Sequence, residues 1–282
     1  KLSTLLRGGR VITTDANRKM ITEYSHIFSK SSLGIIAGPC VIESREHTIK
    51  IAEELSKISE RIGIPIVFKS SFDKANRSSI SSYRGVGLNK GLDILNDVKH
   101  IVGMSITTDI HEASQASKVG EVVDIIQIPA FLSRQTDIII EAAKTGKTVN
   151  LKKGQFLSPH DMKNVIKKAA SVGCNDILVT ERGTQFGYNN LVSDMRSIPI
   201  IQENNVPVIF DATHSNQLPG IGGVRKMIPY LAKAAVAVGC DGLFFEVHDN
   251  PEKALSDATT QWPLDKFEEL LLQIIRIHDA LQ

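Results

Sequence analysis

The sequence predicts an α/β fold that consists of a single (β/α)8 TIM barrel. Three observations support this prediction. Short apolar runs rich in Val and Ile recur eight times, amphipathic stretches separate them, and together they occupy residues 33–282. An open, doubly wound sheet normally has fewer strands and a Gly-rich turn after the first strand. Here the first run is followed by Gly38-Pro39-Cys40, so the barrel is favoured.

Each apolar run is too short for a helix and has the composition of a strand buried on both faces. In order, the predicted strands are residues 33–37, 64–69, 104–109, 122–128, 148–152, 176–180, 207–211 and 242–246. Residues 48–62 have apolar side chains close to i, i+3, i+4 spacing, which predicts a helix, and residues 264–281 form the last helical pattern. No low-complexity linker divides residues 33–282, so they are expected to form one catalytic domain.

Residues 1–32 differ from the rest because they are rich in Lys and Arg and poor in acids. A transit peptide is one interpretation of this composition. We prefer an N-terminal extension that forms a β-hairpin, since residues 11–13 and 20–22 flank the polar stretch 15–18. Such a hairpin is expected to close the bottom of the barrel.

Composition and charge exclude several classes of protein. The 282 residues are 42% hydrophobic and 23% charged, with a net charge of +2, which does not favour nucleic acid or a membrane surface as a partner. No apolar run approaches the roughly 18 residues of a membrane span. The three cysteines are an odd and sparse set, which indicates a reducing compartment and predicts a cytoplasmic protein.

The ends of the predicted strands carry the chemistry, because barrel enzymes place their active sites at the carboxyl ends of strands. The polar residues found there are Cys40, Lys69, Asp109, Gln127, Lys152, Arg182, His214 and Glu246. Cations at or just beyond these ends are Lys69, Lys74, Arg77, Arg134, Lys152 and Arg182. Because converging cations repel one another, a site that gathers them is suited to anionic substrates.

A second set of residues predicts a metal site. Cys40, His214, Glu246 and Asp257 follow the first, seventh and eighth strands, which become neighbours when a barrel closes. Thiolate and imidazole ligands favour Zn or Fe(II), with Mn and Co as further possibilities. His111 fits either a helix start or a ligand for a sugar hydroxyl, whereas His248 and His278 are expected to lie outside the site.

Five segments resemble the 3-deoxy-D-manno-octulosonate 8-phosphate synthase family over about residues 33–281. They are residues 38–44 (GPCVIES), 68–79 (FKSSFDKANRSS), 127–132 (QIPAFL), 180–183 (TERG) and 210–215 (FDATHS). The sister family of 3-deoxy-arabino-heptulosonate 7-phosphate synthases shares the barrel and the metal ligands. It is less similar, because it has Lys-Pro-Arg-Thr where this chain has residues 74–77 (KANR).

The resemblance implies a reaction. Phosphoenolpyruvate condenses with D-arabinose 5-phosphate and water, giving the eight-carbon sugar acid phosphate and inorganic phosphate, a step toward lipopolysaccharide-type sugars. It also implies a homotetramer. The implied phosphoenolpyruvate ligands are Lys69, Lys74, Lys152 and Arg182. Asn76, Arg77 and Ser78 would hold arabinose 5-phosphate, with Arg77 and Ser78 on its phosphate, and Asp109 and Gln127 would line the sugar channel. Arg134 is a further predicted substrate-binding residue. The implied catalytic residues are Lys69, Lys74, Lys152, His214 and Asp257.

The family has a metal-free class with Asn, and a metal-dependent class with Cys, at the position of Cys40. The resemblance therefore implies the metal-dependent class. Two alternatives stay open: the sister heptulosonate synthase, and a catalytically inactive barrel that acts as a binding protein. The presence of Lys152 and Arg182 argues against the inactive barrel.

Overall fold

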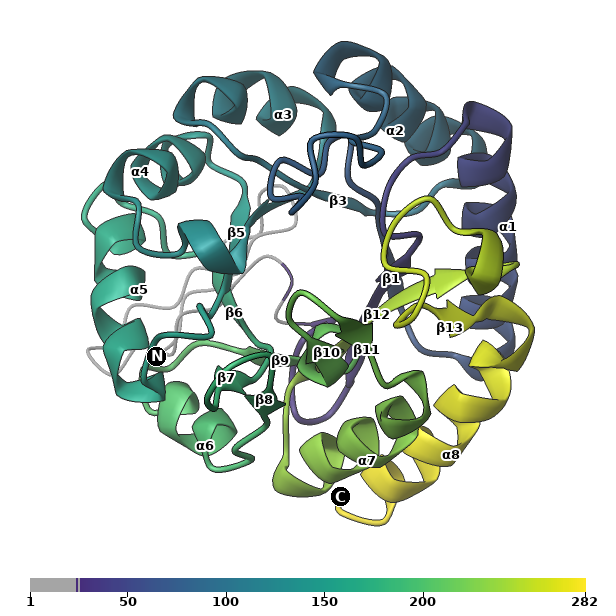
Figure 1. Ribbon diagram of the computed structural model, residues 1–282. Helices are drawn as coiled ribbons and strands as arrows, with labels where there is room; N and C mark the ends of the chain where they lie inside the picture. Colours follow the sequence, from purple (N-terminus) through teal and green to yellow (C-terminus); the bar gives the residue numbers. More distant parts are fainter. Residues whose placement is uncertain (1–23, 25) are drawn as a thin grey trace, which may run out of the picture.

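The computed structural model describes residues 24 and 26–282 and contains a closed barrel of eight parallel strands, which confirms the predicted fold (Figure 1). The strand order is β1-β2-β3-β4-β5-β6-β9-β12, and β1 pairs with β12 to close the ring. The barrel strands are β1 Gly34–Gly38, β2 Ile66–Lys69, β3 Ile106–Asp109, β4 Ile125–Ile128, β5 Thr148–Lys152, β6 Ile177–Glu181, β9 Val208–Asp211 and β12 Gly242–His248.

Helices surround the barrel and alternate with its strands along the chain (Figure 1). They are α1 Arg45–Ile62, α2 Leu88–Val102, α3 Ala116–Val122, α4 Thr136–Lys144, α5 Met162–Ala170, α6 Ser197–Gln202, α7 Ile228–Val238 and α8 Phe267–Asp279. Short 3-10 helices are Ala113–Gln115, Ala130–Leu132, Pro159–Asp161, His214–Asn216, Arg225–Met227, Pro251–Lys253 and Leu264–Lys266.

Helix α1 begins three residues before the predicted start at residue 48. Ser44 has extended backbone dihedrals, and its side chain accepts a hydrogen bond from the backbone N–H of His47. This cap recruits the polar residues 45–47 into the first turn, which the apolar pattern alone does not reveal. The helix ends at Gly63, whose φ of 70° is the left-handed conformation that glycine adopts without strain.

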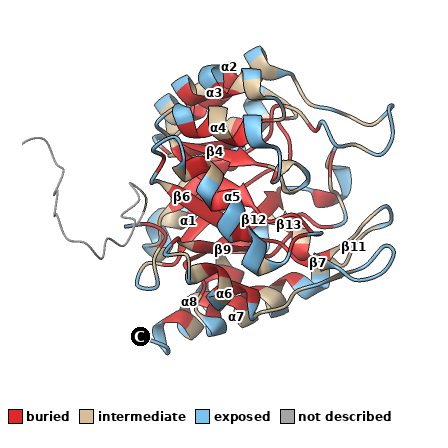
Figure 2. Ribbon diagram, turned by 90° about the vertical axis from the view of Figure 1, so that its left-hand side faces the viewer, coloured by how far each residue is buried: buried red, intermediate tan, exposed pale blue. Residues whose placement is uncertain are grey.

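Two apolar cores hold the barrel together. The larger core lies between strands and helices, so the strands are buried while the helices expose only their outer faces (Figure 2). The smaller core fills the inside of the barrel, and the turn before β1 contributes Ile27 and Phe28 to it. The other buried residues of this inner core are Ile36, Val67, Ile125, Leu178, Ile209 and Phe244.

Ile27 and Phe28 thus pack at the amino-terminal ends of the strands and close the bottom of the barrel. Phe28 is only 1% exposed. The predicted hairpin strands, 11–13 and 20–22, lie outside the described residues. The proposed boundary between an extension and a barrel domain at residue 33 remains a prediction, although β1 begins at Gly34.

Short strands extend the opposite, carboxyl-terminal rim. Strands β7 Thr184–Gln185 and β8 Leu191–Val192 pair with each other, as do β10 Gln217–Leu218 and β11 Gly222–Gly223. Strand β13 Trp262–Pro263 pairs with the end of β12. In Figure 2 the loops that carry β7 and β11 project from one end of the barrel, where they surround its mouth.

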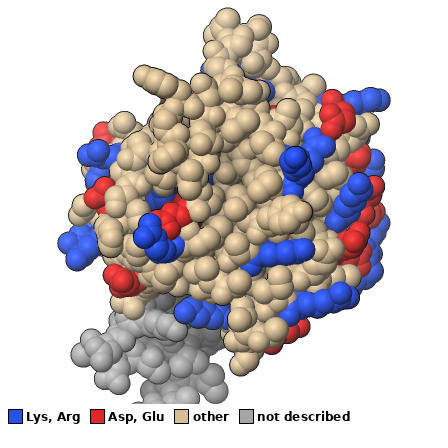
Figure 3. Space-filling view, turned by 60° about the horizontal axis from the view of Figure 1, so that its bottom comes forward, with Lys and Arg blue, Asp and Glu red and all other residues tan. Residues whose placement is uncertain are grey.

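Charges of both signs are interspersed on the face seen in Figure 3, where Lys and Arg side chains lie beside Asp and Glu. An ion pair joins α1 to α8, where Arg61 Nη2 lies 2.7 Å from Glu268 Oε2. Among the described residues, no helix combines the length and the apolar composition that crossing a membrane requires.

Candidate active site

The carboxyl-terminal end of the barrel contains a cavity of about 690 Å³. Most of the residues predicted to bind substrate or metal line it: Lys69, Lys74, Asn76, Arg77, Ser78, Asp109, Gln127, Lys152, Arg182, His214 and Asp257. These residues come from six strand ends and from the loops after β2 and β12. The barrel therefore brings together side chains that are up to 188 positions apart in the sequence, as the prediction from strand ends requires.

The loop after β2 turns back over the cavity, and a close approach of β1 to β2 fixes its start. A Cβ atom on Gly38 would lie 1.9 Å from the carbonyl oxygen of Lys69, so only glycine fits there. Lys69 is 1% exposed, and its Nζ donates to Ser71 Oγ at 2.8 Å and to the Cys40 carbonyl at 3.2 Å. These bonds hold the Lys69 side chain where it lines the cavity.

Buried cations dominate one side of the cavity. Lys152 is 5% exposed, and its Nζ donates to Asp211 Oδ2 at 2.5 Å while lying 3.8 Å above the ring of Phe244. Arg182 is 4% exposed, and its Nη2 donates to Gln217 Oε1 at 2.5 Å. The other terminal nitrogen of Arg182, Nη1, is buried and has no hydrogen-bond partner among the described residues. Such a donor is suited to an anion that enters the cavity.

Burial and neighbouring charges shift the ionisation of these groups. Burial lowers the pKa of Lys152, and Asp211 offsets only part of that effect. Burial likewise lowers the pKa of Arg182. Burial alone would raise the pKa of Asp109, but Lys69 and His111 outweigh it and hold that pKa well below the usual range. A bound anion would favour the charged forms of the Lys and Arg groups, so these shifts indicate a site that is completed by its ligand.

The predicted metal ligands gather beside the lysines. One ligand atom each from Cys40, Glu246 and Asp257 can be chosen so that all lie within 4.8 Å of one another. His214 Nε2 lies 3.5 Å from Glu246 Oε1 and 3.6 Å from Asp257 Oδ2. Cys40 and Glu246 are fully buried, and Glu246 Oε2 has no hydrogen-bond partner among the described residues.

This donor set fits a divalent metal ion. A thiol, an imidazole and two carboxylates are the ligand types of Zn and Fe(II) sites. Burial, followed by the charges of Asp257 and Glu246, raises the pKa of the Cys40 thiol well above its usual value. A cation between these groups would reverse that effect, because it favours the thiolate. Asp257 also has a φ of 48°, an uncommon backbone conformation for a residue other than glycine, which is typical of functional sites.

Asp211 orients His214, a role that the sequence did not reveal. The Nδ1 of His214 donates to Asp211 Oδ2 at 2.7 Å, which leaves Nε2 facing Glu246 and Asp257. Burial opposes the charged imidazole, but Asp211 and Glu246 outweigh it and raise the pKa of His214. A carboxylate behind a histidine is the usual outer partner of a metal-binding imidazole. Asp211 therefore serves both Lys152 and His214.

The mouth of the cavity is more exposed and contains the residues predicted to bind a sugar phosphate. Asn76 and Ser78 are exposed at the mouth. Arg77 Nη1 donates to Ser256 Oγ at 3.0 Å and lies 3.6 Å from Asp257 Oδ1, while its Nε is buried without a partner among the described residues. The cavity thus has two cationic ends, one buried and one near the mouth.

Two further predictions have a defined place in the structure. Arg134 is exposed and is not among the residues that line the cavity, because it lies in the turn before α4. His111 lines the cavity, and its Nε2 lies 3.1 Å from Asp109 Oδ2. This position agrees with the interpretation of His111 as a site residue rather than only a helix start.

Comparisons with known proteins place the chain among enzymes of one type. The model of the DAHP synthetase I family matches residues 22–282. A protein of Synechococcus sp. named 2-dehydro-3-deoxyphosphooctonate aldolase is 53% identical over 254 residues, which cover 88% of this chain and 89% of the relative. A protein of the same name from Azoarcus sp. is 54% identical, over 88% of this chain and 91% of the relative. Another from Rickettsia bellii is 56% identical, over 85% of this chain and 89% of the relative.

Proposed function

The chain belongs to the DAHP synthetase I family, and we propose that it condenses phosphoenolpyruvate with D-arabinose 5-phosphate and water. The products are 3-deoxy-D-manno-octulosonate 8-phosphate, an eight-carbon sugar acid phosphate, and inorganic phosphate. The relatives' name refers to the same eight-carbon, 3-deoxy keto-acid phosphate. The observation that carries the proposal is the set of buried cations in the cavity, above all the unpartnered Nη1 of Arg182.

Phosphoenolpyruvate is proposed to occupy the buried end. It has a carboxylate and a phosphate, and Lys69, Lys74, Lys152 and Arg182 offer donors on several sides of the cavity. Lys74 Nζ and Lys69 Nζ lie 3.6 and 3.5 Å from Glu246 Oε1, so they form one cluster around that carboxylate. Cations fixed in a buried site bind an anion without having to reorganise, which also stabilises charge that develops during the reaction.

The sugar phosphate is proposed to enter from the mouth. Asn76, Arg77 and Ser78 would hold its phosphate end, while Asp109 and Gln127 would bind hydroxyl groups along the channel. Gln127 is 3% exposed and accepts a weak hydrogen bond from Asn150 Nδ2 at 3.4 Å, which fixes its amide. This arrangement points the aldehyde carbon of the sugar inward, toward C3 of phosphoenolpyruvate, and holds the two reacting carbons together.

The proposed reaction forms one carbon–carbon bond and releases phosphate. C3 of phosphoenolpyruvate forms the new bond to the aldehyde carbon, whose oxygen gains a proton. Water adds to C2 and loses its protons, the bond between C2 and the phosphate oxygen breaks, and phosphate leaves. Lys69, Lys74 and Lys152 are the proposed catalytic cations around the reacting atoms. Asp211 is proposed as a positioning residue, because it holds both Lys152 and His214.

Cys40, His214, Glu246 and Asp257 are proposed to hold a divalent ion, Zn or Fe(II), with Mn or Co as substitutes. When bound, such an ion supplies Lewis acidity toward an oxygen atom of a substrate or of water. The chain's own contribution is to fix the four donors: Cys40 Sγ lies 3.0 Å from Ser256 Oγ and 3.5 Å from Asp257 Oδ2. We further propose a cytoplasmic homotetramer that serves lipopolysaccharide-type sugar synthesis.

The acceptor sugar tests this function. The purified protein is mixed with phosphoenolpyruvate and either arabinose 5-phosphate or erythrose 4-phosphate, and consumption of phosphoenolpyruvate is followed. We expect faster turnover with arabinose 5-phosphate. Faster turnover with erythrose 4-phosphate would instead assign the sister heptulosonate synthase activity, and no turnover with either sugar would favour an inactive, ligand-binding barrel.

A further inference from the structure

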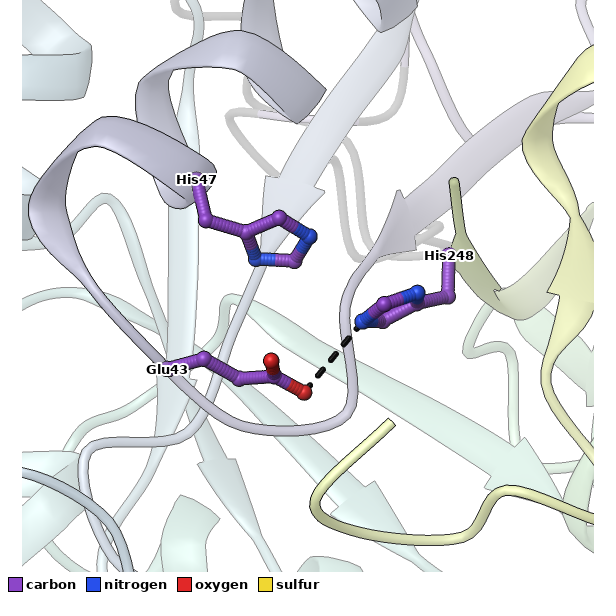
Figure 4. Close-up of side chains that lie close together, drawn as sticks. All are labelled: Glu43, His47 and His248. Carbon is purple, nitrogen blue, oxygen red and sulfur yellow. Dashed lines mark hydrogen bonds and ion pairs between the residues drawn. The ribbon is translucent and has the colours of Figure 1, made fainter. Parts of the chain in front are cut away.

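A second group of possible metal ligands lies outside the cavity, between the start of α1 and the end of β12. It consists of Glu43, His47 and His248, and one ligand atom from each can be chosen so that all lie within 4.8 Å of one another. Figure 4 shows the three side chains converging from the β1–α1 loop, helix α1 and strand β12. None of the three lines the active-site cavity. No local motif places His248 in a site, since its partners are about 200 positions away.

His47 presents an unused nitrogen. Its Nε2 lies 3.0 Å from Asp249 Oδ1, and because a carboxylate only accepts, Nε2 donates in this contact. In the neutral imidazole, Nδ1 then has a free lone pair. Nδ1 is buried and has no hydrogen-bond partner among the described residues. A buried acceptor without a donor is unfavourable unless a ligand satisfies it.

His248 and Glu43 complete the group. His248 is 3% exposed, and its Nε2 donates to Glu43 Oε1 at 3.2 Å. Its Nδ1 accepts from the backbone N–H of Asn250 at 2.9 Å and also lies 3.2 Å from Asp249 Oδ1. For Nε2 to bind a metal, the ring proton must move to Nδ1, where Asp249 Oδ1 can accept it, and the backbone N–H of Asn250 must give up its hydrogen bond to Nδ1.

We propose that Glu43, His47 and His248 form a second binding site for a divalent cation of the zinc class. Two imidazoles and one carboxylate are a common zinc ligand set with an open fourth position. Tetrahedral zinc ligands lie roughly 3.4 Å apart, given bonds of about 2.0–2.2 Å. Because the three ligand atoms lie within 4.8 Å of one another, they must approach by at most about 1.4 Å. Asp249 would hold both imidazoles from behind, as outer carboxylates do in metal sites.

Solvent reaches this group on one side, and an ion bound there would connect two loops of the active site. The side chains of His47 and Asp249 are 17% and 29% exposed, so the group is open to solvent on that side. Glu43 follows Cys40 by three residues, and its Oε1 also accepts from the backbone N–H of Leu255, two residues before Asp257. An ion at this site would therefore tie together the loops that carry two of the proposed catalytic ligands.

Metal stoichiometry tests the proposal without depending on catalysis. Metal-free full-length protein is titrated with Co²⁺, and bound Co²⁺ is measured by elemental analysis and absorption. We expect two equivalents in the wild type. Cys40→Ser should lose the equivalent bound in the active site, which gives thiolate-to-cobalt absorption. His47→Ala and Glu43→Gln should each lose the equivalent bound at the second site and keep the thiolate-to-cobalt absorption. His100→Ala, which removes an exposed histidine at the end of α2, is the control and should retain both.

The thiolate-to-cobalt absorption also shows that each variant of the second site is correctly folded. A wild-type protein that binds a single equivalent, lost in Cys40→Ser and retained in His47→Ala, would overturn the proposal. Two equivalents that both persist in His47→Ala and Glu43→Gln would overturn it as well. Neither result would bear on the proposed condensation, which is measured separately through the acceptor sugar.

Discussion

The two ends of the barrel are formed by the same eight strands but contain opposite kinds of side chain. At the carboxyl-terminal end, buried Lys69, Lys152 and Arg182 surround carboxylates in a cavity of about 690 Å³. At the amino-terminal end, Ile27 and Phe28 pack onto the inner apolar core. Phe244 lies where the two ends meet, since it belongs to the inner core while its ring lies under Lys152 Nζ.

The difference separates function from stability. Burying several charges lowers the free energy of unfolding, because each charge loses its hydration and needs a partner or a bound ligand. Burying apolar rings raises it. The apolar lower end can therefore offset the cost of the upper end. Substitutions at the top should change catalysis more than folding, and substitutions at the bottom should do the reverse.

Of three substitutions that compare the two ends, Asp211→Asn should have the largest catalytic effect. It removes the carboxylate that binds Lys152 Nζ at 2.5 Å and His214 Nδ1 at 2.7 Å. Losing the outer carboxylate behind a metal-binding histidine typically lowers activity about 10- to 100-fold, and Lys152 loses its partner as well, so kcat/KM should fall by about a hundredfold. The pH profile of kcat should also shift, because both partners lose their counter-charge.

The control is Asp241→Asn, at the opposite end of the barrel. Asp241 Oδ2 accepts from the backbone N–H of Val208 and from Gln202 Nε2, so this carboxylate supports the fold at the amino-terminal end of β9. Asp241→Asn should lower the unfolding free energy and leave KM for phosphoenolpyruvate unchanged. Equal catalytic losses in both variants would contradict the division between the two ends.

Phe28→Ala should have a smaller effect on catalysis and a clear effect on stability. Removing a buried Phe side chain leaves a cavity and typically costs about 3–5 kcal/mol. We expect a lower midpoint in urea unfolding, with kcat and both KM values within about twofold of wild type at a temperature where the variant is folded. A selective loss of kcat without a change in unfolding would show that the bottom plug also shapes the site.

Much of the fold could be predicted because each buried parallel strand appears in the sequence as a short run rich in Val and Ile. Each predicted strand overlaps an observed one, and the helix starting at residue 48 was wrong only at its beginning, where Ser44 caps three polar residues. The hairpin in residues 1–32 stays a prediction, because its strands lie outside the described residues.

The site was predictable only as far as strand ends and family motifs indicate it. They led to the cavity, but Arg134 is exposed and does not line it in this chain. Asp211 was missed although one of its partners, His214, is only three residues away, while its contact with Lys152 spans 59 positions. His248 was set aside because Glu43 lies 205 positions away. Pairings at such separations follow from barrel closure and leave no local pattern.

The most direct test of the account is metal dependence of the condensation. Phosphoenolpyruvate consumption in the presence of arabinose 5-phosphate is measured before and after exhaustive chelation, and again after adding Zn, Fe(II), Mn or Co. Chelation should abolish turnover, and at least one of these ions should restore it, because Cys40, His214, Glu246 and Asp257 converge beside the buried lysines. Full activity in protein shown by elemental analysis to contain no metal would contradict it.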